Sequence, residues 1–197
     1  TYGTPSGVTP EDGTSPNFAE IVSNNLNMEL LNTSQPGATV KDALGVGRTS
    51  YTNQVEEIIN FAPNVVTIML GVNDAASATK VPLGTIEDVY DATNVTFYAG
   101  LGEIVNQIQT ALPSTTIILI SSPKNLVTAN MTSYFNAVEE VAEKYNVLFC
   151  DLYNICGVNL NNEAIRNEFA IVAGQVHPNY KAHKVMGSRL TGFIASH

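Results

Sequence analysis

Apolar residues along this chain fall into two kinds of pattern, one with a helical period and one of short continuous runs. Apolar positions three or four residues apart predict helices over residues 18–31, 51–61, 101–112, 134–145 and 179–194. Continuous apolar runs rich in β-branched residues predict strands over residues 65–70, 115–120 and 147–150. A further short strand is expected from Met28 to Asn32, where it overlaps the end of the first helix.

The order of these elements predicts the fold class. The strands are apolar on both faces and alternate with helices, which is typical of a parallel sheet covered on two sides. We therefore expect an α/β fold, a three-layer α/β/α sandwich with a mostly parallel sheet in a flavodoxin-like arrangement. Because the sequence shows no internal repeat and no linker, residues 1–197 are expected to form a single domain.

Polar motifs follow the predicted strands at the edge where such sheets bind ligands. Gly71-Val72-Asn73-Asp74 directly follows the run over residues 65–70, and Ser121 and Asp151 follow the next two strands. A second motif, His177-Pro178-Asn179, stands at the start of the last predicted helix. An amide donor and an imidazole base at one edge indicate acyl-ester hydrolysis.

Composition excludes some classes of partner. Hydrophobic residues make up 44% of the 197 positions and charged residues 14%, which is an ordinary globular composition. The net charge of −9 argues against nucleic acid or an anionic membrane as a partner. No apolar run approaches the roughly 20 residues that a membrane helix needs. Few Lys with abundant Asn, Ser and Thr favour a secreted, cell-surface or virion-associated protein.

The two cysteines, Cys150 and Cys156, lie six residues apart around the end of a predicted strand. We expect two buried thiols, with a local disulfide as the alternative. Two sulfurs without a nearby pair of histidines do not form a typical metal site. No metal ion is therefore expected at these cysteines.

Three motifs together resemble the sequence blocks of the SGNH, or GDSL-type, hydrolase family. The segment from Asn32 to Thr39, with Gly37 five residues after the Asn, is similar to the second block. Gly71-Val72-Asn73-Asp74 is similar to the third block, and His177-Pro178-Asn179 to the fifth, with His183 six residues after His177. The resemblance spans essentially the whole chain and implies one SGNH-hydrolase-like domain.

The resemblance also implies a role for each motif residue in an esterase mechanism. His177 would act as the general base. The backbone N–H of Gly37 and the side-chain amide of Asn73 would donate hydrogen bonds into the oxyanion hole. Gly71 and Asp74 would support this arrangement, with Asp74 bonding to nearby backbone. The remaining histidines are expected to be non-catalytic.

The chain departs from the family pattern at two places. The first block, Gly-Asp-Ser, ends in a sequence that Thr1-Tyr2-Gly3 resembles, so the nucleophilic serine and the first strand are expected before Thr1 or from another chain. The family has Asp three residues before the histidine, whereas this chain has Gly174. A backbone carbonyl, Asp151 or Glu168 would then orient the ring, leaving a dyad.

Two functions of different classes follow. The first is a serine esterase-type hydrolase that cleaves O-acyl esters, first of all a small acyl group on a carbohydrate, through an acyl-enzyme and without a cofactor. The alternative is a non-catalytic SGNH-like module that binds a glycan or belongs to a surface assembly, which the absent serine block and Gly174 favour. The long segment over residues 75–96 is expected to face the substrate.

Overall fold

The computed structural model describes residues 16–47, 52–76, 81–91, 93, 95–124, 131–171 and 177–197. The chain divides into two compact units. The sheet unit comprises Thr33–Ser122 and Thr128–Cys150. The α1/α9 unit comprises Thr1–Asn32, Pro123–Val127 and Asp151–His197. A single domain over residues 1–197 stays a prediction.

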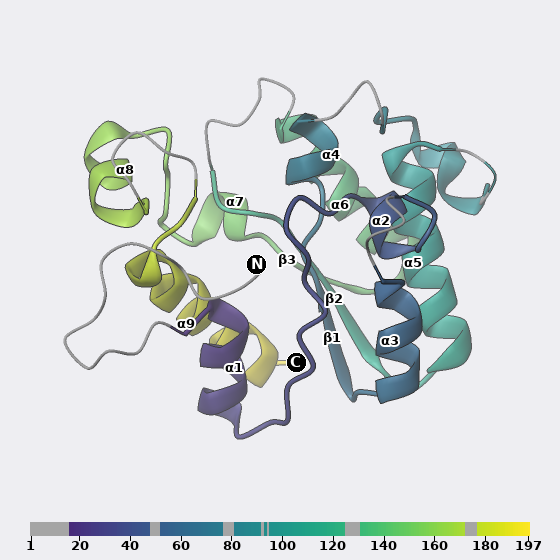
Figure 1. The fold of residues 1–197 in the computed structure, drawn as a ribbon, viewed down its shortest axis with the longest axis horizontal. Helices are drawn as coiled ribbons and strands as arrows, with labels where there is room; N and C mark the ends of the chain where they lie inside the picture. Colours follow the sequence, from purple (N-terminus) through teal and green to yellow (C-terminus); the bar gives the residue numbers. More distant parts are fainter. Residues whose placement is uncertain are drawn as a thin grey trace. The chain divides into compact units, whose positions relative to one another are not determined.

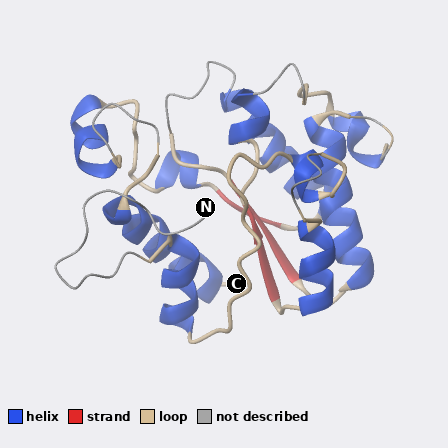
Figure 2. Cartoon of the chain, viewed as in Figure 1, coloured by secondary structure: helices blue, strands red, loops and turns tan. Residues whose placement is uncertain are grey.

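Among its described residues, the sheet unit has three parallel strands in the order β1-β2-β3. Figure 2 draws the strands in red. The strands are β1 (Val65–Ile68), β2 (Thr116–Ile120) and β3 (Leu148–Cys150). Val65 pairs with Thr116, and Ile118 pairs with Leu148. All three strands lie within the predicted runs, and the open parallel sheet confirms the predicted α/β class. Because the strands are parallel, their carboxyl ends lie at one edge.

The described residues of the same unit form five α-helices and one 3-10 helix, namely α2 (Val40–Ala43), α3 (Gln54–Phe61), α4 (Val72–Ala76), η1 (Ile86–Tyr90), α5 (Phe97–Ala111) and α6 (Met131–Tyr145). Helices α5 and α6 carry the chain from β1 to β2 and from β2 to β3, and they pack against each other (Figure 1). Helix α6 also contacts β2 and β3. Residues 117–120 of β2 are fully buried or nearly so, and they form the centre of the core.

Local backbone signals set the helix boundaries. The three non-glycine residues with positive φ among those described, Asn27, Ala62 and Asn146, each have φ 52° and follow the ends of α1, α3 and α6. A left-handed residue at this position closes the last turn of a helix. The first helix therefore ends at Leu26, five residues earlier than the sequence pattern predicts.

The predicted strand from Met28 to Asn32 is wrong, since the described residues 28–32 form no strand. A strand is defined by its hydrogen bonds to a neighbour, and no described strand pairs with this segment. Met28, Leu30 and Leu31 are 37–39% exposed, so these apolar side chains are not buried as a strand in a covered sheet would require.

The described part of the segment over residues 75–96 packs against α5 and α6. Helix η1 contacts both helices, and Val81 and Val89 are buried. Tyr134 Oη donates to the Val81 carbonyl at 2.8 Å, and Tyr145 Oη donates to the Val89 carbonyl at 2.9 Å. These bonds hold the segment on α6.

The α1/α9 unit contains four described helices, α1 (Phe18–Leu26), α7 (Leu152–Ile155), α8 (Glu163–Phe169) and α9 (Tyr180–Ala195). Helices α1 and α9 pack side by side (Figure 1). His183 of α9 accepts a hydrogen bond at Nδ1 from the Phe18 backbone N–H at 3.1 Å, and the two rings are stacked. Burial lowers the pKa of His183 to about 4, so its ring is neutral and structural.

Gly187 determines how closely α1 approaches α9, which gives a test by substitution. A Cβ at Gly187 would lie 2.7 Å from Cγ2 of Ile21, whereas a Cβ at Gly192 of the same helix would meet nothing within 4 Å. We expect Gly187→Ala to lower the free energy of unfolding by about 1–3 kcal/mol through overpacking. Gly192→Ala is expected to raise it by about 0.5–1 kcal/mol.

Denaturant unfolding of both variants measures this difference. The two substitutions change the same helix by the same methyl group, so helix propensity affects both equally. Equal stabilities of the Gly187 and Gly192 variants would contradict the close contact with Ile21.

Within the described ranges, no helix combines the length and apolarity that crossing a membrane requires.

Candidate active site

The motif Gly71–Asp74 forms the turn that leads from β1 into α4. Gly71 has φ 112°, a conformation that L side chains rarely adopt, and a Cβ there would lie 3.3 Å from the ring of Phe97. The Gly71 carbonyl accepts a hydrogen bond from the Ala75 N–H at 2.8 Å. The turn therefore requires glycine, and it places Asn73 and Asp74 in the first turn of α4.

Asp74 joins this turn to the segment that contains Gly37. Its Oδ1 accepts from the Val40 N–H at 2.9 Å, and its Oδ2 accepts from the Gly71 N–H at 3.2 Å. The side chain is completely buried. One carboxylate thus fixes two motifs that are far apart in the sequence.

Burial raises the pKa of Asp74 from 3.8 to about 6. The hydrogen bonds from the Val40 and Gly71 backbone favour the ionised form and limit the rise, while the nearby Asp42 adds to it. Asp42 is itself buried and accepts at Oδ2 from the Thr39 N–H at 2.9 Å. The ionised carboxylate therefore binds both motifs, but its burial away from water costs free energy.

The raised pKa predicts a pH dependence of stability. Between pH 4 and 6, Asp74 is largely protonated in the folded protein and largely ionised in the unfolded chain. Because the folded state binds more protons, the contribution of Asp74 to the free energy of unfolding falls as the pH rises. From pH 4 to 7, we expect the free energy of unfolding of the wild type to fall by about 2.4 kcal/mol relative to Asp74→Asn.

Two measurements check this prediction. Denaturant unfolding at both pH values gives the relative change. Carbon NMR of labelled aspartates should show one carboxyl that titrates near pH 6 and is missing from the Asp74→Asn spectrum. A full set of aspartates titrating near pH 4 would contradict the prediction.

Asn73 lies next to the turn that contains Gly37. Its Nδ2 donates to the Ala38 carbonyl at 3.0 Å, and its side chain is half-buried. Gly37 has φ 69° and is exposed. A carboxamide carries two N–H groups, and the bond to Ala38 uses one of them. The structure therefore brings together Gly37, Gly71, Asn73 and Asp74, four of the five predicted site residues.

Side chains of α3 and the preceding loop fasten the Gly37 segment. Gln54 donates through Nε2 to the Thr33 carbonyl, and Gln35 donates through Nε2 to Thr52 Oγ1 at 2.6 Å. The Ala38 N–H donates to the Gln35 carbonyl at 3.3 Å and closes a turn. The backbone around Gly37 is thus held in a defined conformation.

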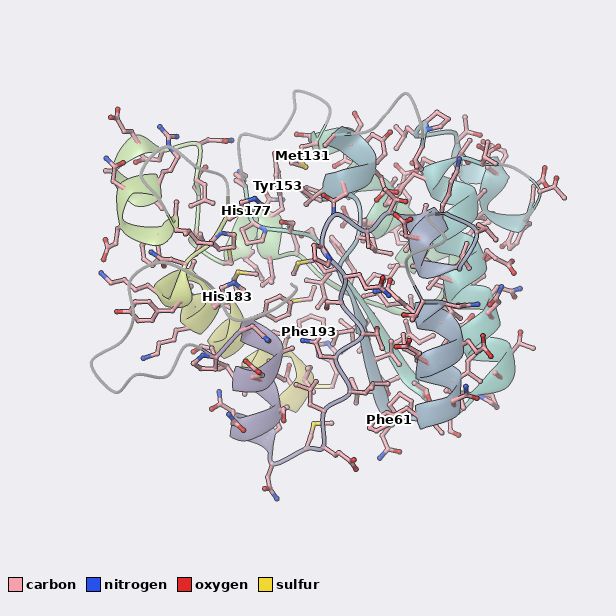
Figure 3. The ribbon with its side chains drawn as sticks, in the orientation of Figure 1. Phe61, Met131, Tyr153, His177, His183 and Phe193 are labelled. Atoms are coloured by element: carbon pink, nitrogen blue, oxygen red, sulfur yellow. The ribbon has the colours of Figure 1, made fainter. Side chains whose placement is uncertain are left out.

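His177, the fifth predicted site residue, belongs to the α1/α9 unit. Figure 3 shows it apart from His183, in the loop before α9. Its side chain is exposed, and its carbonyl accepts from the Ile171 N–H at 2.9 Å. Among the described residues of this unit, none gives the ring a hydrogen bond. Gly174 lies outside the described residues.

The two carboxylates that the sequence offered as partners of His177 make other bonds in the same unit. Asp151 caps α7, where it accepts from the Asn154 N–H at 3.1 Å and from Asn154 Nδ2 at 2.8 Å. Glu168 forms an exposed ion pair with Lys181 at 3.3 Å. The orientation of the His177 ring by either group stays a prediction.

Both cysteines are buried thiols, which confirms the expectation. Cys156 Sγ accepts a hydrogen bond from the Val158 N–H at 3.3 Å. Over the described parts of the chain, no group of three or more His, Cys, Asp or Glu side chains could hold a metal ion.

Sequence reasoning missed Asp42 and the short helix α2. Thr39 and Asp42 form a capping box, since the Thr39 N–H and hydroxyl both donate to Asp42 Oδ2 at 2.9 Å. The signal was present as Thr39-Val40-Lys41-Asp42, the spacing of a capping box. This box starts α2 directly after the Gly37 turn and so shapes the predicted site.

Solved structures with similar folds cover nearly the whole chain, although no curated protein matches it in sequence. A protein from Lactobacillus plantarum is 20% identical with a TM-score of 0.76, over 100% of this chain and 99% of that one. An acetyl xylan esterase is 17% identical with a TM-score of 0.66, over 90% of each chain. A family two carbohydrate esterase from Clostridium thermocellum is 18% identical with a TM-score of 0.62, over 98% of this chain and 58% of that one.

These identities show the fold alone, whereas the sequence pattern shows the family. The profile of the GDSL-like lipase/acylhydrolase family matches residues 1–185, which include all five predicted site residues. The chain therefore belongs to the GDSL-like lipase/acylhydrolase family, a family of ester hydrolases.

Proposed function

We propose that this protein hydrolyses O-acyl esters through an acyl-enzyme, with Gly37, Asn73 and His177 as the groups that act on the reacting atoms. The observation that carries the proposal is the bond from Asn73 Nδ2 to the Ala38 carbonyl. It places one amide donor beside the backbone of a left-handed glycine turn. Two donors side by side are what a developing oxyanion requires.

The proposed reaction has two steps. In the first, His177 removes the proton from a serine hydroxyl, and the serine oxygen attacks the ester carbonyl carbon. The Gly37 N–H and the second N–H of Asn73 donate to the oxyanion, which collapses and expels the alcohol with the proton from His177. In the second, water attacks the acyl-serine in the same way and releases the acid. The serine is that of the Gly-Asp-Ser block expected before Thr1.

A small acyl group on a carbohydrate is the proposed substrate. The chain shares its fold with an acetyl xylan esterase and with a carbohydrate esterase, which supports this choice without fixing the sugar. The exposed position of Gly37 agrees with an ester that approaches from solvent.

The test uses the full natural chain, assayed on p-nitrophenyl acetate. We expect a burst of about one equivalent of p-nitrophenol per site, followed by slower turnover, because the acyl-enzyme accumulates. Rates on acetylated xylan and on longer p-nitrophenyl esters then show which alcohol and which acyl group the protein prefers. Absence of turnover on every ester would contradict the proposal and favour a glycan-binding module.

A further inference from the structure

Asn179 donates three hydrogen bonds to carbonyls at the C-terminal end of α8. Its backbone N–H donates to the Phe169 carbonyl at 2.7 Å. Its side-chain Nδ2 donates to the Glu168 carbonyl at 2.7 Å and to the Ala170 carbonyl at 3.1 Å. Three consecutive carbonyls, which a helix end leaves without intrahelical partners, are therefore satisfied by one residue.

The other half of the same side chain starts α9. Asn179 Oδ1 accepts from the Lys181 N–H at 3.0 Å and from the Ala182 N–H at 3.2 Å, as an N-cap does. The side chain is 2% exposed, and both N–H groups and the oxygen of the carboxamide are used. Asn179 thus joins the end of α8 to the beginning of α9 in a buried position.

This junction also contains the main chain of His177. Ile171, the residue after Ala170, donates its N–H to the His177 carbonyl at 2.9 Å. Ala170 and Pro178 form an antiparallel bridge. His177 is therefore held on one side by Ile171 and, two residues later, by Asn179.

We propose that Asn179 is a positioning residue that fixes the backbone of His177 by tying it to the end of α8. This inference rests on the proposed function, in which His177 is the general base. An N-cap needs only the carboxamide oxygen. The two hydrogen bonds from Nδ2 to α8 are therefore not needed for capping, and we assign them to holding the His177 loop. A base displaced by about 1 Å loses on the order of 10²-fold in rate.

Two substitutions separate this role from helix capping. Asn179→Ser keeps an oxygen that can cap α9 but removes both donations to α8. Asn179→Asp also keeps the cap, but it places a carboxylate oxygen, which cannot donate a hydrogen bond, against the Glu168 and Ala170 carbonyls. Asn162→Ser is the matched control, because Asn162 caps α8 at an exposed position by accepting from the Ile165 N–H at 3.2 Å.

Amide hydrogen exchange of Ile171 reports the bond to the His177 carbonyl directly. We expect both Asn179 variants to exchange this amide roughly tenfold faster or more than the wild type and Asn162→Ser. NMR relaxation should show a more mobile His177 in the same two variants. Unchanged exchange and relaxation in both would overturn the proposal.

A measurement on the wild type keeps the test independent of whether the variants fold. The side-chain NH₂ protons of Asn179 should exchange slowly, because both are hydrogen-bonded and the Asn179 side chain is buried. Exchange as fast as that of an exposed asparagine would overturn the proposal without any substitution.

Kinetics separate the failure of this inference from the failure of the proposed function. On p-nitrophenyl acetate, the full natural chain should lose ten- to a hundredfold in kcat on Asn179→Ser, with little change in KM. Full activity of Asn179→Ser with a mobile His177 would overturn the positioning role alone. Full activity of His177→Ala would overturn the proposed function, whereas the exchange result would still report the junction.

Discussion

Replacement of His177 by alanine is expected to abolish ester hydrolysis, with a loss of about 10⁴-fold in kcat, near the upper limit for a general acid–base. The same imidazole has two tasks in the proposed reaction, since it activates serine or water and then protonates the leaving group. Folding should be unaffected, because the His177 side chain is exposed and has no hydrogen bond among the described residues of its unit.

His197→Ala is the matched control for this experiment. His197 is also exposed, and its ring bonds to the Phe193 carbonyl at 2.9 Å at the end of α9. Initial rates with p-nitrophenyl acetate and thermal unfolding of both variants give the comparison. Retention of a tenth or more of the wild-type kcat by His177→Ala would show that another group is the base.

Substitution of Asn73 by alanine is expected to lower kcat by about 10²–10³-fold, which corresponds to the loss of one oxyanion donor, or roughly 3–4 kcal/mol. The KM should change little, because the charge on the oxyanion develops only in the transition state. Steady-state kinetics of Asn73→Ala measures both quantities.

Asn73 also bonds to Ala38, so its removal disturbs the Gly37 turn as well as the chemistry. Gln54→Ala controls for this effect, since Gln54 fastens the same segment through the Thr33 carbonyl without facing the reaction in our proposal. We expect Gln54→Ala to cost less than about tenfold in kcat. An equal loss in both variants would assign the effect of Asn73 to loop geometry.

Long elements with a clear apolar period were predictable from the sequence. The strands and the helices α3, α5, α6 and α9 lie close to their expected ranges, because each buries a continuous stripe or run. Helices α2, α4, α7 and α8 were missed, since four to seven residues are too short to show a helical period. They are set by caps, such as Asn162 for α8, and by neighbouring turns.

The candidate site divides in the same way. The proximity of Asn73 to the Gly37 turn follows from motif resemblance, and the bond between Asn73 and Ala38 agrees with it. The contacts of Asn179 with α8 could not be predicted, because nothing in the local sequence identifies which carbonyls a side chain will meet. The same holds for His183, which has the sequence position of a motif residue but packs against Phe18.

The buried carboxylate of Asp74 has a consequence for any attempt to redesign specificity. Because it binds Val40 on one segment and Gly71 on the other, a change in either segment shifts the backbone of its counterpart. In a double-mutant cycle, substitutions near Gly37 and near Asn73 should therefore show a coupling energy of about 0.5–3 kcal/mol. Substitutions in the two segments are therefore best selected together, because the effect of one on activity will depend on the other.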